Sequence, residues 1–143
     1  MIVVAADHAA VDFKAEIVRL LADRGEDCRD LGTFDDASVD YPDFAHRLVE
    51  EIAADRADRG ILICGTGIGM SMTANRHAGI RAALCHDAYT AEMARRHNDA
   101  NVLCLGARVL GDGVAAQIVE VFLTTEFDGG RHQRRVEKIE PAR

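Results

Sequence analysis

An unbroken apolar run, Gly60-Ile-Leu-Ile-Cys64, is followed at once by the glycine-rich segment Gly65-Thr-Gly-Ile-Gly69. Strands that are apolar on both faces occur in sheets that helices cover on both sides, and such sheets are mostly parallel. A glycine-rich turn between a strand of this kind and a helix is typical of α/β proteins. The run therefore predicts a central parallel strand that leads through a tight turn into a helix.

Strand-like and helix-like segments alternate along the rest of the chain. Short, mostly apolar segments predict five strands, over residues 1–6, 26–31, 60–64, 80–85 and 101–105. Apolar residues at helical spacing predict helices over residues 9–24, 42 to about 53, 69–76, 87–97 and 113–125, before a short basic helix near the C-terminus. The alternation predicts an α/β fold, a Rossmann-like three-layer α/β/α sandwich with a five-stranded parallel sheet, formed by residues 1–143 as a single domain.

The charge distribution bears on the partners of the chain. The formal net charge is −7, which argues against binding to nucleic acid or to an anionic membrane surface. Residues 131–143 nevertheless carry a net +3, from Arg131, Arg134, Arg135, Lys138 and Arg143 against two glutamates. A small basic cluster on an acidic protein suits one small anion better than a polyanion.

The cysteines and the first residues bear on the cellular compartment. The four cysteines, at positions 28, 64, 85 and 104, form no C-x-x-C pair and have no histidine at zinc-finger spacing, so we expect free thiols and no metal site. The first residues lack the basic start of a signal peptide, and no apolar run is long enough to span a membrane. We therefore expect a cytoplasmic protein.

Polar residues follow three of the predicted strands at the point where each strand ends. Asp7-His8 follows the first strand, the segment from Cys64 to Gly69 follows the third, and Gly106-Ala-Arg108 follows the fifth. The carboxyl ends of parallel strands meet at one edge of the sheet, where α/β proteins bind their ligands. These three segments therefore predict one ligand site.

The glycine-rich segment could hold an anion. Glycines let the backbone approach a ligand closely, and the start of a helix presents unpaired N–H groups. The ligand could be a phosphate or an oxyanion formed during a reaction, and a tight turn without a ligand is the alternative. The spacing of Gly65, Gly67 and Gly69 matches neither the dinucleotide fingerprint nor the P-loop.

Cys64 stands directly before this turn. The helix dipole and nearby amides favour the thiolate of such a cysteine, so it can exchange a proton near neutral pH. A thiol that is simply packed is the alternative, and it is what we expect for Cys28, Cys85 and Cys104.

Three further groups are candidates for binding or catalysis. Asp7-His8 pairs a carboxylate with an imidazole, although Asp7 could instead cap the first helix. His97-Asn98-Asp99 ends a predicted helix, where a histidine could also interact only with the helix dipole. Arg131 and Arg135 lie one helical turn apart and suit a phosphate, with a solvated charged face as the alternative.

Fragments along almost the whole chain resemble the type B ribose-5-phosphate isomerase family, which also includes galactose-6-phosphate isomerase subunits. The fragments are Ala6-Asp-His8, Asp40-Tyr-Pro42, Gly60 to Gly69, Ala74-Asn75, Gly79-Ile-Arg-Ala82, His97-Asn-Asp99, Leu105-Gly-Ala-Arg108 and Gly129-Gly-Arg-His-Gln-Arg-Arg135. Each fragment is weak alone, but their shared order is highly specific.

The resemblance implies an aldose–ketose isomerase that interconverts D-ribose 5-phosphate and D-ribulose 5-phosphate through an enediol(ate), without a metal or cofactor. It implies that Cys64 moves the proton between C1 and C2, that Thr66 handles protons on the sugar oxygens, and that His97 opens the furanose ring. The hole for the oxyanion would be formed by the backbone amides of the glycine-rich segment, at Gly65, Gly67, Ile68 and Gly69, together with Asn98.

The resemblance also implies how the substrate and the subunits are arranged. Asp7 would bind hydroxyls, and the residues that hold the phosphate or adjacent substrate would be His8, Arg108, Arg131 and Arg135. In the family the site forms between two subunits, so the histidine, the asparagine and the C-terminal arginines would come from a partner chain. A homodimer is implied, which could pair further into a homotetramer.

Two departures from the family pattern stand out. Ala10 stands where the family commonly has glycine, and Met70 stands where some relatives have a catalytic glutamate. Because Met70 cannot carry a proton, Cys64 has no evident substitute.

Other functions remain open from the sequence alone. The substrate could be a four-carbon or six-carbon aldose phosphate, since nothing in the loops fixes the chain length. A nucleotide-binding regulatory module would use the glycines but leave Cys64, His97 and Asp7 without roles. A thiol-redox protein would need a resolving cysteine near Cys64, and the sequence has none there.

Overall fold

Five parallel strands form one sheet in the order β2-β1-β3-β5-β4. The computed structural model describes residues 1–141, so Arg143 of the basic cluster lies outside the described residues. The strands are β1 (Ile2–Ala6), β2 (Cys28–Asp30), β3 (Arg59–Cys64), β4 (Ala82–Leu84) and β5 (Val102–Gly106). The predicted five-stranded parallel sheet is confirmed, with β3 at its centre between β1 and β5.

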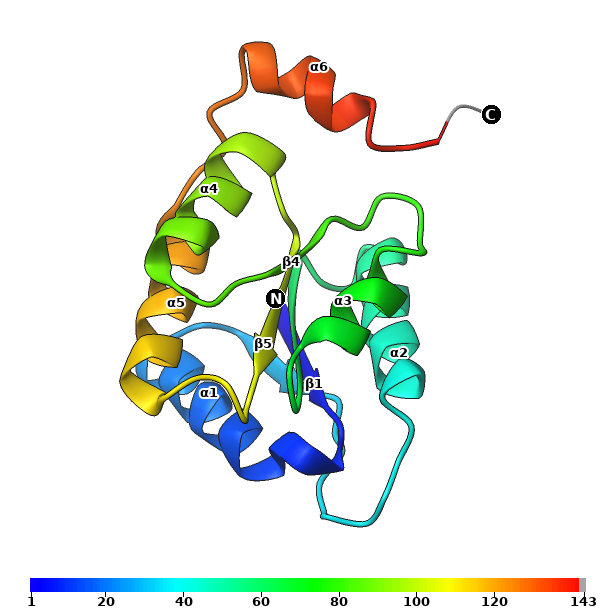
Figure 1. Cartoon of the computed structure of the whole chain (residues 1–143), viewed down its shortest axis with the longest axis vertical. Coiled ribbons are helices and arrows are strands. Elements are labelled where there is room, and N and C mark those ends of the chain that lie inside the picture. The colour runs from blue at the N-terminus through cyan, green and yellow to red at the C-terminus, as the bar shows by residue number, and fades with distance from the viewer. Residues whose placement is uncertain (142–143) are drawn as a thin grey trace.

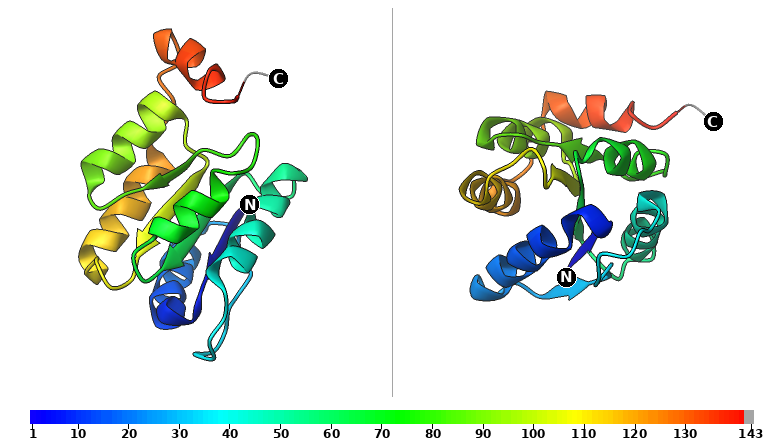
Figure 2. Two further views of the ribbon diagram at one scale, coloured as in Figure 1. Left: turned by 45° about the vertical axis from the view of Figure 1, so that its right-hand side comes forward. Right: turned by 60° about the horizontal axis from the view of Figure 1, so that its bottom comes forward.

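Helices cover both faces of the sheet (Figure 1). They are α1 (Val11–Asp23), α2 (Tyr41–Ala53), α3 (Ile68–Ala74), α4 (Ala88–Asn98), α5 (Asp112–Thr124) and α6 (Arg131–Glu137), with a 3-10 turn, η1 (His8–Ala10), before α1. The helices α1, α4 and α5 pack on one face, and α2 and α3 pack on the other, as Figure 2 shows. The predicted three-layer sandwich is therefore confirmed.

The central strand β3 is apolar on both sides because both sides are covered. Ile61 and Ile63 belong to the core on the α1 side, whereas Leu62 and Cys64 belong to the core on the α2 side. Residues 61–63 are fully buried. The apolar run in the sequence thus reflects a strand that has no solvent-facing side.

The two strands at the sheet edges are shorter than predicted. The segments 26–31 and 80–85 contribute only Cys28–Asp30 and Ala82–Leu84 to the sheet. Each of these strands pairs with one neighbour only, β2 with β1 and β4 with β5. Both neighbours continue beyond the paired part, β1 to Ala6 and β5 to Gly106, so each edge strand ends where it leaves its neighbour, a point that the segment's own sequence does not record.

The last helix, α6, lies beside α4, beyond the end of the sheet at which the strands begin (Figure 1). It carries Arg131, Arg134 and Arg135 of the basic cluster on a mostly exposed surface, and Val136 is its buried residue. None of the helices within residues 1–141 combines the length and the apolar character that crossing a membrane requires.

Gly60 allows α2 to pack closely on β3. A Cβ atom at this position would lie 2.4 Å from Cδ2 of Leu48. We predict that Gly60→Ala lowers the free energy of unfolding by about 1–3 kcal/mol, because extra volume in a packed core forces neighbours apart. Urea denaturation at fixed protein concentration measures this change.

A double variant and a control make this prediction specific. The double variant Gly60→Ala/Leu48→Ala should lose less free energy of unfolding than the two single variants together, because the clash is absent once Leu48 is truncated. Gly113→Ala is the control, because a Cβ at Gly113 would meet nothing within 4 Å. Strict additivity of Gly60→Ala and Leu48→Ala would contradict the packing argument.

Candidate active site

The glycine-rich loop curls back over the end of β3. The backbone N–H of Gly67 donates a hydrogen bond to Sγ of Cys64, at 3.1 Å, and the Cys64 side chain is buried in the chain, with 5% exposure. Gly67 has a φ of +79°, and a Cβ there would lie 2.9 Å from the carbonyl carbon of Leu105. Only glycine fits this position, and the loop therefore holds the sulfur at the carboxyl edge of the sheet.

The end of β5 supports the same loop. The amide of Ala107 donates to the carbonyl oxygen of Cys64 at 2.9 Å, and the amide of Arg108 donates to that of Gly65 at 3.0 Å. A Cβ at Gly106 would lie 2.6 Å from the carbonyl oxygen of Thr66. The backbone of β5 thus sets the position of the loop.

Arg108 extends from this end of β5 along the loop. Its Nη1 would be 3.3 Å from a Cβ at Gly65, and the side chain is exposed. A guanidinium group therefore lies beside the thiol loop, as the sequence predicts.

Asp7 and His8 complete this edge from the end of β1. The amide of Asp7 donates to the carbonyl of Ile63, at 3.2 Å, which places Asp7 beside the end of β3. Oδ1 of the buried Asp7 accepts the amide of Ala9 at 3.0 Å, so Asp7 does cap the first turn of helix, which was the alternative to a binding role.

His8 presents a hydrogen-bond donor. Its Nδ1 lies 3.1 Å from the amide nitrogen of Val39 and accepts its hydrogen. A neutral imidazole with an acceptor at Nδ1 carries its hydrogen on Nε2. His8 can therefore donate from Nε2 to an oxygen of a ligand.

Two of the backbone amides predicted for an oxyanion hole have partners within the chain. Gly67 donates to Cys64 Sγ, and Ile68 donates to Thr66 Oγ1 at 3.3 Å. A ligand oxygen at this place would have to share these donors or take them over. Gly69 follows in the first turn of α3.

Of the other cysteines, Cys85 and Cys104 are buried and Cys28 is partly buried on the edge strand β2. Burial raises the pKa of Cys85 to about 11 and raises the pKa of Cys104 well above its usual range. Burial also raises the pKa of Cys28. All four cysteines are free, but only Cys64 lies against the glycine-rich loop.

The remaining predicted residues lie at the opposite edge of the sheet. His97 and Asn98 end α4, and α6 carries Arg131 and Arg135. The register of β3 and β5 places Cys64 opposite Gly106 at their carboxyl ends, whereas α4 ends just before β5 begins. Five residues of strand separate the two edges by about 16 Å. One chain does not bring the two groups together.

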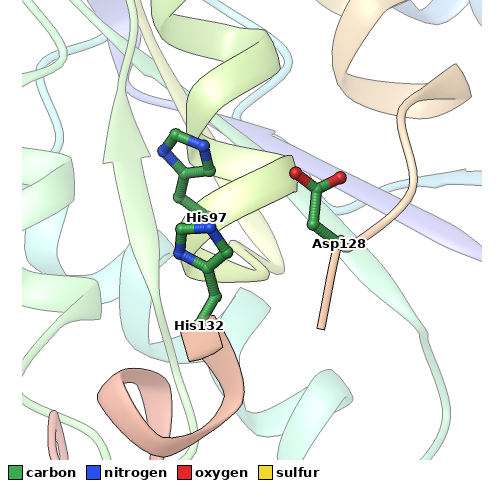
Figure 3. A group of neighbouring side chains, drawn as sticks. All are labelled: His97, Asp128 and His132. Atoms are coloured by element: carbon green, nitrogen blue, oxygen red, sulfur yellow. The ribbon is translucent and has the colours of Figure 1, made fainter. Parts of the chain in front are cut away.

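His97 has two polar neighbours at this second edge, as Figure 3 shows. The donor atoms of His97, Asp128 and His132 all lie within 4.8 Å of one another, which makes them a possible metal-binding group among the described residues. However, the two imidazole planes differ by only 10°, so their in-plane lone pairs do not converge on one point. Arg96 Nε also bonds both carboxylate oxygens of Asp128. The geometry fits stacking and ion pairing better than chelation.

Sequence reasoning gave no role to Tyr41. A Cβ at Gly69 would lie 2.6 Å from the Tyr41 ring, which is partly exposed beside the loop. In the sequence, Asp40-Tyr-Pro42 only contributes to the family resemblance. Its position before a predicted helix does not reveal that the ring lies against the loop.

A parallel sheet covered by helices, with a glycine-rich loop at its carboxyl edge, places the protein in the Rossmann-like α/β class. The comparisons with known proteins give the family. The chain belongs to the Ribose/Galactose Isomerase family, whose model matches residues 2–139, and it is a sugar-phosphate isomerase. It is 47% identical to ribose-5-phosphate isomerase B of Escherichia coli (strain K12) over 133 residues, which cover 93% of this chain and 89% of the relative.

Two further relatives bear on the substrate and the fold. The D-erythrulose-4-phosphate isomerase of Pectobacterium atrosepticum is 45% identical over 140 residues, covering 96% of this chain and 91% of the relative. The crystal structure of a ribose 5-phosphate isomerase from Thermotoga maritima is similar to this chain with a TM-score of 0.95 at 51% identity. The match covers 96% of this chain and 95% of that one.

We predict that Gly106→Ala lowers kcat/KM at least about tenfold, because the new methyl group would displace the backbone of Thr66 and small displacements in an active site are costly. Isomerase turnover measures the effect, with circular dichroism to confirm folding. Gly111→Ala is the control, since a Cβ there meets nothing within 4 Å. Equal activity of the two variants would refute the contact's importance.

Proposed function

We propose that the protein interconverts D-ribose 5-phosphate and D-ribulose 5-phosphate by proton transfer through an enediolate, in a site that two copies of the chain share. The observation that carries this proposal is the loop of Cys64, which holds a sulfur beside the start of a helix at the edge where Asp7, His8 and Arg108 also lie. The ribose-5-phosphate isomerases among the relatives support the choice of substrate.

Cys64 carries the proton between C1 and C2. Isomerisation without hydride transfer needs one group that removes and returns a proton, and a thiolate at the start of a helix suits that task. Thr66 moves protons between the sugar oxygens from its exposed place on the loop.

The oxyanion that forms on the substrate is stabilised by backbone amides. Gly65, Gly67, Ile68 and Gly69 supply donors from one chain, and Asn98 supplies its side-chain amide from the partner. The donors of Gly67 and Ile68 pass from Sγ and Thr66 Oγ1 to the substrate oxygen as charge develops on it. Losing one donor of this kind costs on the order of 100-fold in rate.

The phosphate and the hydroxyls are bound by charged groups on either side of the loop. Asp7 accepts hydrogen bonds from sugar hydroxyls, and His8 donates from Nε2. Arg108 from the same chain and Arg131 and Arg135 from the partner hold the phosphate dianion, for which guanidinium groups have a matching geometry.

His97 opens the furanose ring. Ring opening requires a proton on the ring oxygen, and an imidazole can donate one near neutral pH. His97 is partly exposed at the end of α4, so it can reach a substrate that is bound to a neighbouring chain.

Pairing of two chains completes the site. The residues around Cys64 lie at the carboxyl edge of the sheet, and the candidate residues of α4 and α6 lie at the amino edge. In the proposed dimer, the carboxyl edge of each chain therefore faces the amino edge of its partner. A cavity of about 1120 Å³ lies between α6, the end of α4 and residues 75–83. The exposed apolar side chains of Ile68 and Met72 on α3, at 45% and 66% exposure, suit such an interface. We propose a homodimer, able to pair further into a homotetramer.

Two further features belong to the same proposal. Residues 1–143 act as a single sugar-phosphate isomerase domain, since the family match extends from residue 2 to residue 139. A cytoplasmic location fits a phosphorylated substrate and four free thiols.

A four-carbon substrate is the second candidate, favoured by the similarity to a D-erythrulose-4-phosphate isomerase. The family's description also includes galactose, which favours a test of six-carbon aldose 6-phosphates. The nucleotide-binding module has no comparable support.

We predict that the wild type turns over the five-carbon phosphate most efficiently in a series of four-, five- and six-carbon aldose phosphates. Cys64→Ala should abolish turnover of every member, while phosphate binding is largely kept. Cys28→Ala is the matched control, because this thiol lies on an edge strand away from the loop. Full activity of Cys64→Ala would refute the mechanism, and a preference for another chain length would correct the substrate.

Mixing two inactive variants tests the shared site. We predict that Cys64→Ala and the double variant Arg131→Ala/Arg135→Ala are each inactive, and that their mixture regains about a quarter of wild-type activity. The reason is that about half of randomly paired dimers are mixed and each of those has one intact site. Turnover after subunit exchange measures the gain. A mixture that stays inactive, although native mass spectrometry shows mixed dimers, would place the whole site within one chain.

A further inference from the structure

His132 has no part in the mechanism above, yet its ring lies against the ring of His97. The ring centroids are 4.3 Å apart and the planes differ by 10°, so the two imidazoles are stacked. Figure 3 shows the two side chains as neighbours that come from different helices. His97 ends α4, and His132 lies in the first turn of α6. The stack covers one face of the His97 ring and leaves the ring edges, which carry the nitrogens, free to meet a ligand.

Interactions outside the stack hold the start of α6 in place. The backbone amide of Asp128 donates to the carbonyl of Arg96, at 3.0 Å. Arg96 Nε lies 3.1 and 3.2 Å from the two carboxylate oxygens of Asp128. The amide of His132 donates to the carbonyl of Gly129 at 3.0 Å, and Val136 is buried at the other end of the helix. Replacing the His132 ring therefore leaves α6 attached.

The charges around the stack favour a neutral His132. Partial burial lowers the pKa of His132, and His97, Arg131 and Arg135 lower it further because positive charges repel a second one. Asp128 acts in the opposite direction, but its carboxylate is shared with an arginine of α4. The lowered pKa thus favours the uncharged ring of His132 at neutral pH.

We propose that His132 is a positioning residue for His97, an inference that rests on the proposed ring-opening role of His97. By covering one face of the ring, His132 limits its rotation and keeps one nitrogen directed toward the substrate in the shared site. A general acid acts only within hydrogen-bond reach of the atom that it protonates, so a freely rotating imidazole would spend most of its time misplaced.

The test compares a ring-closed with an open-chain substrate. Ribose 5-phosphate is mostly a furanose, whereas ribulose 5-phosphate cannot close a five-membered ring because its C5 hydroxyl is esterified. His132→Ala should lower kcat/KM for ribose 5-phosphate about tenfold, because this substrate must be ring-opened. It should change by less than about twofold the rate at which ribulose 5-phosphate exchanges its C1 proton with deuterated water, because that exchange needs only the enediolate. Gln133→Ala, at the next and exposed position of α6, is the control that should change neither.

A second variant separates positioning from a general structural role. His132→Phe keeps a flat ring over His97 and should restore turnover of ribose 5-phosphate to within about threefold of the wild type. Its pH profile at neutral and higher pH should match that of the wild type, because the lowered pKa of His132 favours the uncharged ring there. A detached α6 would instead raise KM for both substrates, since Arg131 and Arg135 would move with the helix.

The outcomes distinguish this inference from the proposed function. Equal losses on both substrates in His132→Ala, or no loss on either, would overturn the positioning role. Suppose that the wild type is active and that His97→Asn loses mainly turnover of the ring-closed substrate. Either of those results for His132→Ala would then overturn the role of His132 and leave the proposed function standing. Absence of turnover by the wild type on both substrates would overturn the proposed function, and with it the role of His132.

Discussion

The contact between the loop after β3 and the end of β5 is the constraint on which the carboxyl edge depends. Gly67 and Gly106 each lack a side chain at the point where the backbone of the other segment passes. The parallel register brings Cys64 opposite Gly106, so the sheet determines where the loop begins. The end of β5 then limits the path that the backbone of the loop can take. The backbone of the loop, and with it the sulfur of Cys64, is thereby placed by packing against β5.

Much of the fold and one edge of the site could be predicted from the sequence, because each depends on local patterns. An apolar run such as Gly60 to Cys64 must be covered on both sides, and residues that follow parallel strands must share an edge. Contacts between distant residues could not be predicted in this way. The ring of Tyr41 on Gly69 and the ring of His132 on His97 depend on how helices pack after the sheet has formed.

The separation of the candidate site into two groups follows from the topology of a parallel sheet. A helix that connects parallel strands must return from the carboxyl edge to the amino edge, so α4 ends far from where it began. His97 at its end is then remote from Cys64 of the same chain, although β3, which ends at Cys64, and β5, which follows α4, are neighbours in the sheet. The sequence places His97 at a helix terminus, but only the topology shows which edge that terminus occupies.

The position of the two groups at opposite edges has a genetic consequence if each site draws on two chains. A chain with a defect in one group still leaves one working site when it pairs with a normal chain. A chain with defects in both groups leaves no working site. Its own loop is inactive, and its α4 and α6 cannot complete the site at the loop of the partner. Such an allele would act as a dominant negative, silencing normal copies in proportion to its expression.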